Sequence, residues 1–534
     1  MDPEKKHSIQ KNVLLLLMVL LIGVLVYRYV EINNREYEIK SNKWDKLMLV
    51  LSQVEKHYVD SVDYKDVTEK ILPIILERLD PHSVYFPPVE LKNAEEELEG
   101  NFDGIGIQFN VINDTAIVAS VIPGGPSEKV GIMSGDRIVK VNEEIIAGVK
   151  MDQDSMVSRM KGPSGSMVKI GVNRADVKEM IFFDIKRDKI PAHSVDIAYM
   201  VNDTIGYIRL IRFSRTTYKE VMEATLSLKN NGMKSLIFDL RDNSGGYFDQ
   251  AMLLANEFLK EGELIVYMEG LHRKREDFYA DKSGRLRDIK LAVIINEGSA
   301  SSSEIFAGAI QDNDRGVIVG RRSFGKGLVQ EPIYFSDKSG IRLTIARFYT
   351  PTGRNIQKPV DENYRYDIYE RYRNGELLSA DSIKTNDSLK FTTPGGRTVY
   401  GGGGIIPDLF VPLKTLNEFY AKARNYIPRF ALDMAYNYRS ELKGIKSMDE
   451  LKKLLSSVDL DGKFLKYVAS KNIVPVKDEW KESMPYIMNT VWALISRYSP
   501  LEERAYYAIL NEIDDDVIAA ITANGVLDRI GQGQ

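Results

Sequence analysis

The feature that most constrains the fold is a run of alternating strand and helix patterns across residues 200–412. Three apolar segments within it have the pattern of buried strands: Ser235–Leu240, Leu291–Asn296 and Gly316–Gly320. Alternation with helical segments is typical of an α/β fold. We therefore predict an α/β core built on a mostly parallel sheet with helices.

A loop of glycine and small polar residues follows each of these strands. The loops are Arg241–Gly246, residues 297–304 and Arg321–Gly327. In an open parallel sheet, the loops after the carboxyl ends of the strands gather at one edge. We therefore expect Ser301, in the second loop, to lie near Lys326, in the third. Taken singly, each loop is also compatible with an ordinary turn or helix cap, but their joint placement favours a catalytic site.

Serine needs a base to act as a nucleophile, and a lysine whose pKa is lowered by burial is able to serve. None of the three loops contains a histidine. The helix that begins after Ser301 would point backbone N–H groups at the site, which suits an oxyanion. The residues alone thus favour a serine–lysine pair.

Composition removes several other kinds of chemistry. The chain has 534 residues, no cysteine and five histidines, which excludes thiolate catalysis and cysteine-ligated metal sites. We predict no cofactor and no metal. A net charge of −4 offers no basic surplus for nucleic acid, and we predict no nucleic-acid partner.

The N-terminus predicts a membrane anchor. Residues 13–26 are continuously apolar, the stretch extends to Val30, and Lys5, Lys6 and Lys11 precede it. This pattern favours an uncleaved signal anchor over residues 13–30 with a cytoplasmic stub at 1–12. The rest of the chain would then be exported to the periplasmic side of the inner membrane. A cleaved signal peptide is one alternative, but the sequence after the stretch lacks the small residues expected before a cleavage site. A buried core helix is the other alternative.

The remaining organisation follows from changes in pattern. We predict an N-terminal helical region at 31–94, a domain of short strands at 95–188, the α/β core at 189–412 and a helical region at 413–534. A polar, tyrosine-rich segment at about 358–390 has the character of an insertion into the core.

The segment Gly298–Gln330 closely resembles the signature of the C-terminal processing peptidases, or tail-specific proteases, which are serine peptidases of family S41. Other segments similar to this family occur in the expected order and extend the resemblance over roughly residues 40–412: Leu79–Phe86, Gly206–Ser214, Leu236–Gly246, Ala346–Gln357 and Gly403–Asp408. Together with the predicted anchor, the resemblance implies a membrane-anchored serine endopeptidase that recognises the C-terminal tails of proteins.

The resemblance also implies roles for individual residues. Ser301 corresponds to the nucleophile, Lys326 to the general base and Gln330 to the residue that orients the lysine. The backbone N–H groups of Gly246 and Ser302 correspond to the oxyanion donors. The spacing to the lysine distinguishes Ser301 from the neighbouring serines.

Residues 95–188 resemble a PDZ domain. Gly104, Ile105, Gly106 and Ile107 match its carboxylate-binding loop, where successive N–H groups bind a chain-terminal carboxylate. The alternative for this segment alone is a turn and a strand without a ligand. For the whole chain, the competing hypothesis is a PDZ-containing adaptor that does not hydrolyse peptides. A homodimer or a regulatory partner protein is compatible with either hypothesis.

Overall fold

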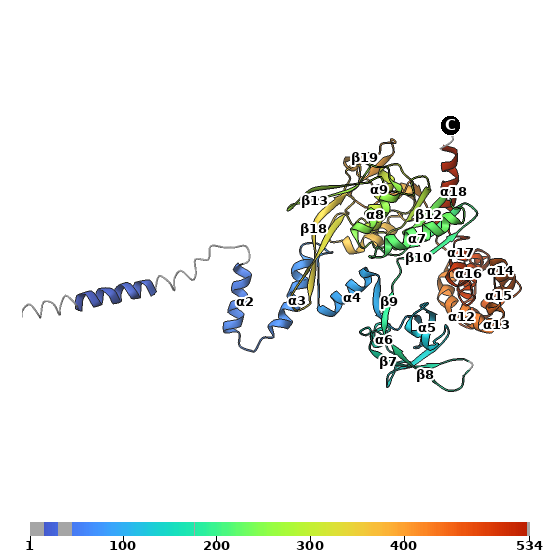
Figure 1. The fold of residues 1–534 in the computed structure, drawn as a ribbon, viewed down its shortest axis with the longest axis horizontal. Coiled ribbons are helices and arrows are strands. Elements are labelled where there is room, and N and C mark those ends of the chain that lie inside the picture. Colours follow the sequence, from blue (N-terminus) through green and yellow to red (C-terminus); the bar gives the residue numbers. More distant parts are fainter. Residues whose placement is uncertain (1–14, 30–44, 176, 531–534) are drawn as a thin grey trace, which may run out of the picture. The chain divides into compact units, whose positions relative to one another are not determined.

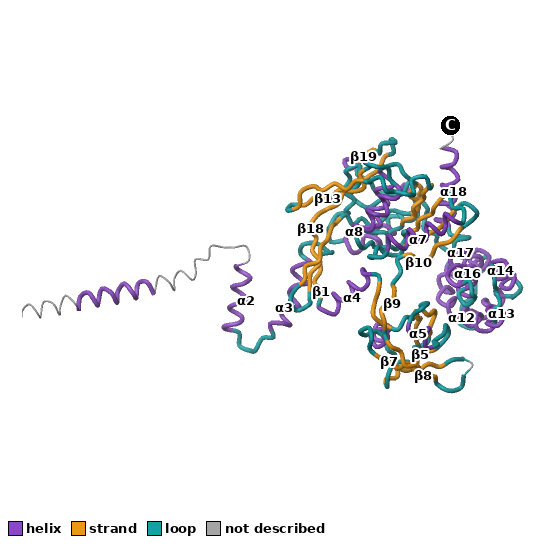
Figure 2. Tube along the Cα trace, in the orientation of Figure 1, coloured by secondary structure: helices purple, strands orange, loops and turns teal. Residues whose placement is uncertain are grey.

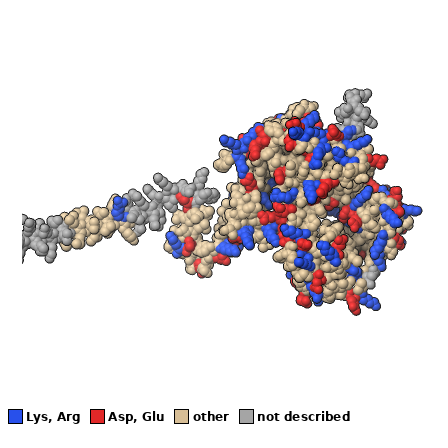
Figure 3. All heavy atoms as spheres, in the orientation of Figure 1, with Lys and Arg blue, Asp and Glu red and all other residues tan. Residues whose placement is uncertain are grey.

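The computed structural model describes residues 15–29, 45–175 and 177–530 of the chain, with side chains to residue 523. They form two compact units, Met1–Ile75 and Leu76–Gln534 (Figure 1). On the face drawn in Figure 3, basic and acidic side chains are interspersed, as the net charge of −4 leads one to expect.

The N-terminal unit consists of helices with little buried surface. Residues 15–29 are helical, and α2 (Asp45–His57) and α3 (Tyr64–Glu77) follow, of which α2 buries no residue. Among the helices of the described residues, none combines the length and apolar character needed to cross a membrane. Residues 13, 14 and 30 of the predicted anchor lie outside the described residues.

The core contains the predicted sheet. Its order is β10 (Val195–Met200), β11 (Ile205–Leu210), β12 (Ser235–Asp239), β15 (Lys290–Ile295), β16 (Val317–Gly320) and β21 (Leu409–Phe410). The β10–β11 pair is antiparallel and the other four pairs are parallel. The prediction of a mostly parallel sheet is therefore confirmed, and the three predicted strands β12, β15 and β16 are adjacent.

Helices cover both faces of this sheet. The helices α7 (Thr217–Asn230), α8 (Phe248–Phe258) and α9 (Ser302–Asp312) pack on one face, in a cluster that includes strand residues Phe238 and Val293 (Figure 1). The alternate strand residues, such as Ile237 and Ala292, belong to a second cluster. The last helix, α18 (Asp515–Ile530), contributes to that second cluster and covers the opposite face.

A second, antiparallel sheet of the core was not predicted. It contains β1 (Val84–Phe86), β13 (Leu264–Gly270), β14 (Arg273–Tyr279), β17 (Leu328–Tyr334) and β18 (Gly340–Tyr349). β1 lies at the end of the Leu79–Phe86 segment, for which the sequence predicted a family resemblance but no strand. The predicted insertion forms short helices, including η1 (Tyr364–Tyr366), α10 (Asp367–Arg373), η2 (Ala380–Ser382) and η3 (Asp387–Leu389), and leads into the hairpin β19 (Lys390–Thr392) and β20 (Thr398–Tyr400).

The domain of short strands has a core of its own. Its sheet has the order β3 (Ile107–Val111), β4 (Ala116–Val121), β5 (Arg137–Val141), β7 (Met167–Asn173) and β8 (Ile181–Lys186), with β6 (Glu144–Ile145) beside β5 and the helices α5 (Pro126–Val130) and α6 (Gln153–Met160). The chain enters and leaves through the paired strands β2 (Asn101–Gly104) and β9 (Asp188–Pro191). Helix α4 (Pro88–Glu99) runs through the boundary predicted between residues 94 and 95.

The C-terminal region is helical, as Figure 2 shows. A separate apolar cluster joins its helices α11 (Glu418–Ala423), α12 (Ile427–Asn437), α13 (Arg439–Lys443), α14 (Met448–Ser456), α15 (Leu460–Ala469), α16 (Glu479–Ser496) and α17 (Glu502–Leu510), with η4 (Arg424–Tyr426) between the first two. α18 leaves this cluster to pack on the core sheet, and α17 contacts the edge strand β10 of that sheet.

Candidate active site

The five predicted site residues of the core line one cavity. Gly246, Ser301, Ser302, Lys326 and Gln330 all border a space of about 850 Å³. Because β12, β15 and β16 are adjacent and parallel, the loops that follow them meet at one edge. The sheet thus brings together what the sequence placed on three separate loops.

Ser301 has a strained backbone at the start of α9. Its φ is 53° and its ψ is −113°, a region that a residue with a side chain seldom adopts. A Cβ atom added to Gly245 would lie 2.8 Å from the Cβ of Ser301, so the absence of a side chain there makes room for the turn. Such strain persists only where the surroundings enforce it, and it often marks a functional residue.

The carboxylate of Glu304 enforces this turn. It accepts hydrogen bonds from the backbone N–H of Ser301 (2.9 Å), of Lys326 (2.9 Å) and of Gly325 (2.7 Å), and from the hydroxyl of Ser323. One side chain therefore holds the second and third loops in register.

Glu304 was missed in the sequence, although the spacing Ser301-x-x-Glu304 was visible as a capping-box pattern. The side chain is fully buried, and burial raises the pKa of its carboxyl group although the hydrogen bonds oppose that shift.

Lys326 is an amine in a desolvated setting. Its Nζ donates to Oε1 of Gln330 at 2.9 Å, and Nε2 of Gln330 donates to the carbonyl of His82 at 2.6 Å. Burial first, and then the charge of Arg342, lower the pKa of Lys326 to about 8. Among the described residues, no hydrogen bond joins Nζ of Lys326 to the hydroxyl of Ser301.

His82 is the histidine that reaches this site, through its backbone. Its Nε2 lies 2.6 Å from the hydroxyl of Tyr364, and burial followed by the charge of Lys326 lowers its pKa to about 4. The ring is therefore neutral at physiological pH and is engaged by Tyr364. The hydrogen bond from Gln330 to the His82 carbonyl links the Leu79–Phe86 segment to the lysine.

Two backbone N–H groups of the cavity wall have no acceptor within the described part of the chain. They belong to Gly246 and Ser302, which are held together because the Ser302 hydroxyl donates to the Gly246 carbonyl at 2.9 Å. Gly246 has a φ of 145°, and an added Cβ would lie 2.0 Å from the carbonyl oxygen of Phe213. Glycine is thus required where the sequence predicted an oxyanion donor.

The predicted insertion packs against the lysine loop. Arg371 of α10 donates to the carbonyls of Ser323 (2.8 Å) and Phe324 (3.2 Å). Nζ of Lys358 lies 3.9 Å from the ring centre of Phe324. The segment supports the backbone beside Lys326.

The predicted tail-binding loop lies apart from this cavity, in the domain of short strands. Gly104 ends β2, Ile107 begins β3, and the carbonyls of Ile105 and Gly106 accept from Ser127 and Ile122 at 3.0 Å each. Among the described residues, no hydrogen bond occupies the N–H groups of Ile105 and Gly106. β3 is an edge strand of its sheet, so one side of it is open to another strand.

Comparison with known proteins places the chain in a family. The sequence matches Peptidase family S41 over residues 204–366 and a PDZ domain over residues 104–183. A carboxy-terminal-processing protease of Bartonella bacilliformis is 36% identical over 338 residues, which are 60% of this chain and 76% of that protein. The chain belongs to the S41 family of carboxy-terminal processing proteases.

Further matches concern both the protease and its C-terminal region. The carboxy-terminal processing protease CtpA of Bacillus subtilis is 34% identical over 318 residues, 59% of this chain and 67% of that protein. The structure aligns with the photosystem II D1 C-terminal processing protease with a TM-score of 0.38 and 24% identity, over 70% of this chain and 88% of that one. Residues 417–499 match a family of unknown function. The chain is thus a serine-type peptidase with a PDZ domain and a helical region of unassigned role.

Proposed function

We propose that this protease cleaves peptide bonds with Ser301 as the nucleophile and Lys326 as its general base. The observation that carries the proposal is the shared cavity. A strained serine and a half-buried lysine line the same space. The only hydrogen-bond acceptor of the lysine amine in the described structure is Gln330. A pKa of about 8 leaves part of the lysine neutral at pH 7 to 8, as a base requires.

The chemistry follows from these positions. The Ser301 hydroxyl transfers its proton to the neutral amine of Lys326 while its oxygen attacks the substrate carbonyl. The N–H groups of Gly246 and Ser302 stabilise the oxyanion that forms. As the C–N bond breaks, the ammonium returns the proton to the leaving amine, and an acyl-enzyme remains. Water then attacks the ester while Lys326 accepts a proton from it. As the ester C–O bond breaks, the ammonium returns that proton to Oγ of Ser301, and the acid leaves.

Because the described structure shows no hydrogen bond between the Lys326 amine and the Ser301 hydroxyl, the lysine must change its partner to act on the serine. Its amine is hydrogen-bonded to Gln330, and catalytic hydrogen bonds commonly form only in the complex with substrate. Gln330, held by the His82 carbonyl, keeps the amine inside the cavity.

We propose further that the PDZ domain binds the substrate's C-terminal tail. The N–H groups of Ile105 and Gly106 would bind the terminal carboxylate, and the edge strand β3 would pair with the tail by β-augmentation. We also propose that residues 13–30 anchor the protein in the inner membrane, with the catalytic body on the periplasmic side. The apolar stretch and the three preceding lysines support this assignment.

The test of catalysis uses a substrate protein with an unstructured, apolar C-terminal tail. Ser301→Ala and Lys326→Ala should each abolish cleavage, and Lys338→Ala, at an exposed turn, should cleave like the parent. A fluorophosphonate probe should label the parent on the Ser301 peptide and should not label Ser301→Ala. Full turnover by either active-site variant would refute the assignment and favour a different base or nucleophile.

Tail capture and topology have separate tests. A peptide with a free C-terminus should bind more tightly than its C-terminal amide, measured by fluorescence anisotropy on Ser301→Ala, and equal affinities would contradict the carboxylate loop. Because the chain has no cysteine, one cysteine introduced at exposed Lys338 reports topology. An impermeant maleimide should label it once the outer membrane is opened and before the inner membrane is. Labelling only after lysis would contradict export.

A further inference from the structure

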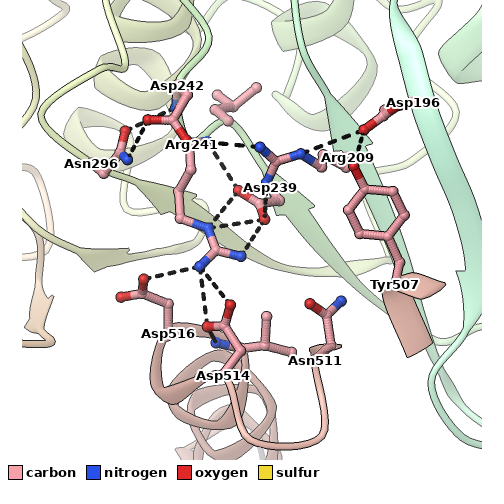
Figure 4. Close-up of polar contacts among 12 residues, drawn as sticks. Asp196, Arg209, Asp239, Arg241, Asp242, Asn296, Tyr507, Asn511, Asp514 and Asp516 are labelled. Carbon is pink, nitrogen blue, oxygen red and sulfur yellow. Dashed lines mark hydrogen bonds and ion pairs between the residues drawn. The ribbon is translucent and has the colours of Figure 1, made fainter. Parts of the chain in front are cut away.

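The helical C-terminal region contributes ion pairs to the base of the active-site loops. Figure 4 shows Asp514, just before α18, and Asp516, in its first turn, beneath the side chain of Arg241. Nη1 of Arg241 lies 2.8 Å from Asp514 and 3.0 Å from Asp516. Asp516 lies 275 residues along the chain from Arg241, outside the protease match at 204–366 and the helical match at 417–499.

Arg241 is the first residue of the loop that ends at Gly246. Its guanidinium also contacts Asp239, at the end of β12, at 2.6 Å. From there the loop continues to Asn243, whose carbonyl accepts from the N–H of Ala300 at 2.9 Å and from the hydroxyl of Ser303 at 2.8 Å. A shift of Arg241 would therefore be transmitted to both the oxyanion loop and the turn that carries Ser301.

Asp516 also reaches the third loop. Nη1 of Arg321, the first residue of the loop that leads to Lys326, lies 3.6 Å from Asp516. Nε of the same guanidinium lies 2.9 Å from Glu297, the first residue of the loop that leads to Ser301. The side chains of Asp516 and Arg321 are each 8% exposed, so water screens their ion pair weakly.

We infer that Asp516 is a positioning residue for catalysis, whose carboxylate ties the bases of the three active-site loops together. The inference rests on the proposed roles of Ser301 and Lys326 and adds a function for a helix outside the matched protease segment. α18 is held on the sheet by Val517 and Ala520, so its first turn presents Asp516 at a fixed place beneath the loops.

A contribution to stability does not explain why a buried aspartate occupies position 516. Oδ1 of Asp516 is buried without a hydrogen-bond partner, and burial raises the pKa of the carboxyl group to about 6 even though two arginines oppose that shift. A buried charge with an unsatisfied oxygen costs stability, and such exceptions to good packing tend to occur at functional sites.

The test compares Asp516→Asn with Asp515→Asn. The asparagine keeps the shape and removes the charge, and Asp515 is a neighbouring carboxylate that is 46% exposed and pairs with Lys414 instead. For Asp516→Asn we expect kcat to fall roughly tenfold, with KM and the affinity for tail peptides within about twofold of the parent. Asp515→Asn should match the parent in every measurement.

A double-mutant cycle separates positioning from a general loss of structure. Arg321→Gln breaks the Arg321–Asp516 pair from the other side and also removes the pair with Glu297, so combining it with Asp516→Asn should lower kcat by less than the product of the two single effects. If Asp516→Asn does not fold, Arg321→Gln carries the test by itself with the same expected split between kcat and KM. Additive effects in the cycle would overturn the inference.

The same preparations include Ser301→Ala. One outcome is that Ser301→Ala is inactive while Asp516→Asn has the same kcat as Asp515→Asn. That outcome would overturn the positioning role and leave the proposed function intact. An active Ser301→Ala would overturn the proposed function itself.

Discussion

The tips and the bases of the active-site loops are held by different forces. At the tips, which carry Ser301 and Lys326, the buried carboxylate of Glu304 accepts four hydrogen bonds, three of them from backbone N–H groups. At the bases, Asp516 contacts the guanidinium groups of Arg241 and Arg321. Backbone hydrogen bonds hold the turns that carry the reacting residues, whereas ion pairs join the first side chains of two loops to α18.

The site depends on both nearby and distant parts of the chain. Glu304 lies three residues from Ser301, so the clamp at the tips belongs to the protease motif itself. The ion pairs at the bases come from a helix near the C-terminus. The same site is thus positioned once by local sequence and once by long-range packing, and the two can be tested apart.

The largest effect is expected at the tips. Glu304→Ala leaves three N–H groups and a hydroxyl without their acceptor in a buried place, which should lower the free energy of unfolding by about 3–5 kcal/mol and cleavage by more than roughly 100-fold. Chemical denaturation and cleavage of a tailed substrate measure the two quantities.

Glu304→Gln is the matched control. Its amide retains one acceptor oxygen, so it should fall between the parent and Glu304→Ala in both measurements. A Glu304→Ala protein with parental turnover would show that the tips of the loops do not depend on the Glu304 carboxylate.

The second prediction concerns the amine that the tips hold. With a pKa of about 8, Lys326 is mostly protonated at pH 6, and a protonated amine cannot accept the serine proton. The value of kcat/KM should therefore rise about 50-fold from pH 6 to pH 8 and then level off. Steady-state kinetics between pH 5.5 and 9.5 measure it.

Arg342→Gln sharpens this test. The charge of Arg342 lowers the pKa of Lys326, so its removal should move the midpoint of the profile to higher pH. The pKa of His82, about 4, lies below the range, so its titration should not contribute to the profile. A profile that is flat from pH 6 to pH 8 would contradict lysine as the base.

The sequence predicted the tips better than the bases for a physical reason. Strand periodicity and the glycine-rich loops located Ser301 and Lys326, because parallel strands bring such loops together whatever their side chains. Glu304 had a local signal, the Ser-x-x-Glu spacing, which also fits an ordinary helix cap. Asp516 had none, since its partners become neighbours only when α18 packs on the sheet.

The antiparallel sheet was missed for a related reason. β17 follows the lysine loop directly, and its pairing with β18 is local, but β1 joins β18 from about 250 residues earlier in the chain, as the Val84 to Arg342 pairing shows. A three-residue strand between prolines gives no periodic signal of its own. The contact matters, because it brings the His82 carbonyl to Gln330.

The smallest expected effect concerns the bases of the loops. Removing the Asp516 charge should favour stability as pH rises, whereas Glu304→Ala at the tips should lower stability. The pKa of Asp516 in the folded protein is about 6, raised from 3.8, so folding favours the protonated form. As pH rises from 4 to 7, the parent loses up to about 3 kcal/mol of unfolding free energy through this group, and Asp516→Asn does not. The stability of Asp516→Asn relative to the parent should therefore increase with pH over that range, measured by urea denaturation. Asp515→Asn should stay within about 0.5 kcal/mol of the parent throughout. If Asp516→Asn is more stable than the parent at pH 7 yet slower in catalysis, the bases of the loops favour position at the expense of stability. If the stability difference between variant and parent does not change with pH, the Asp516 charge does not destabilise the folded protein.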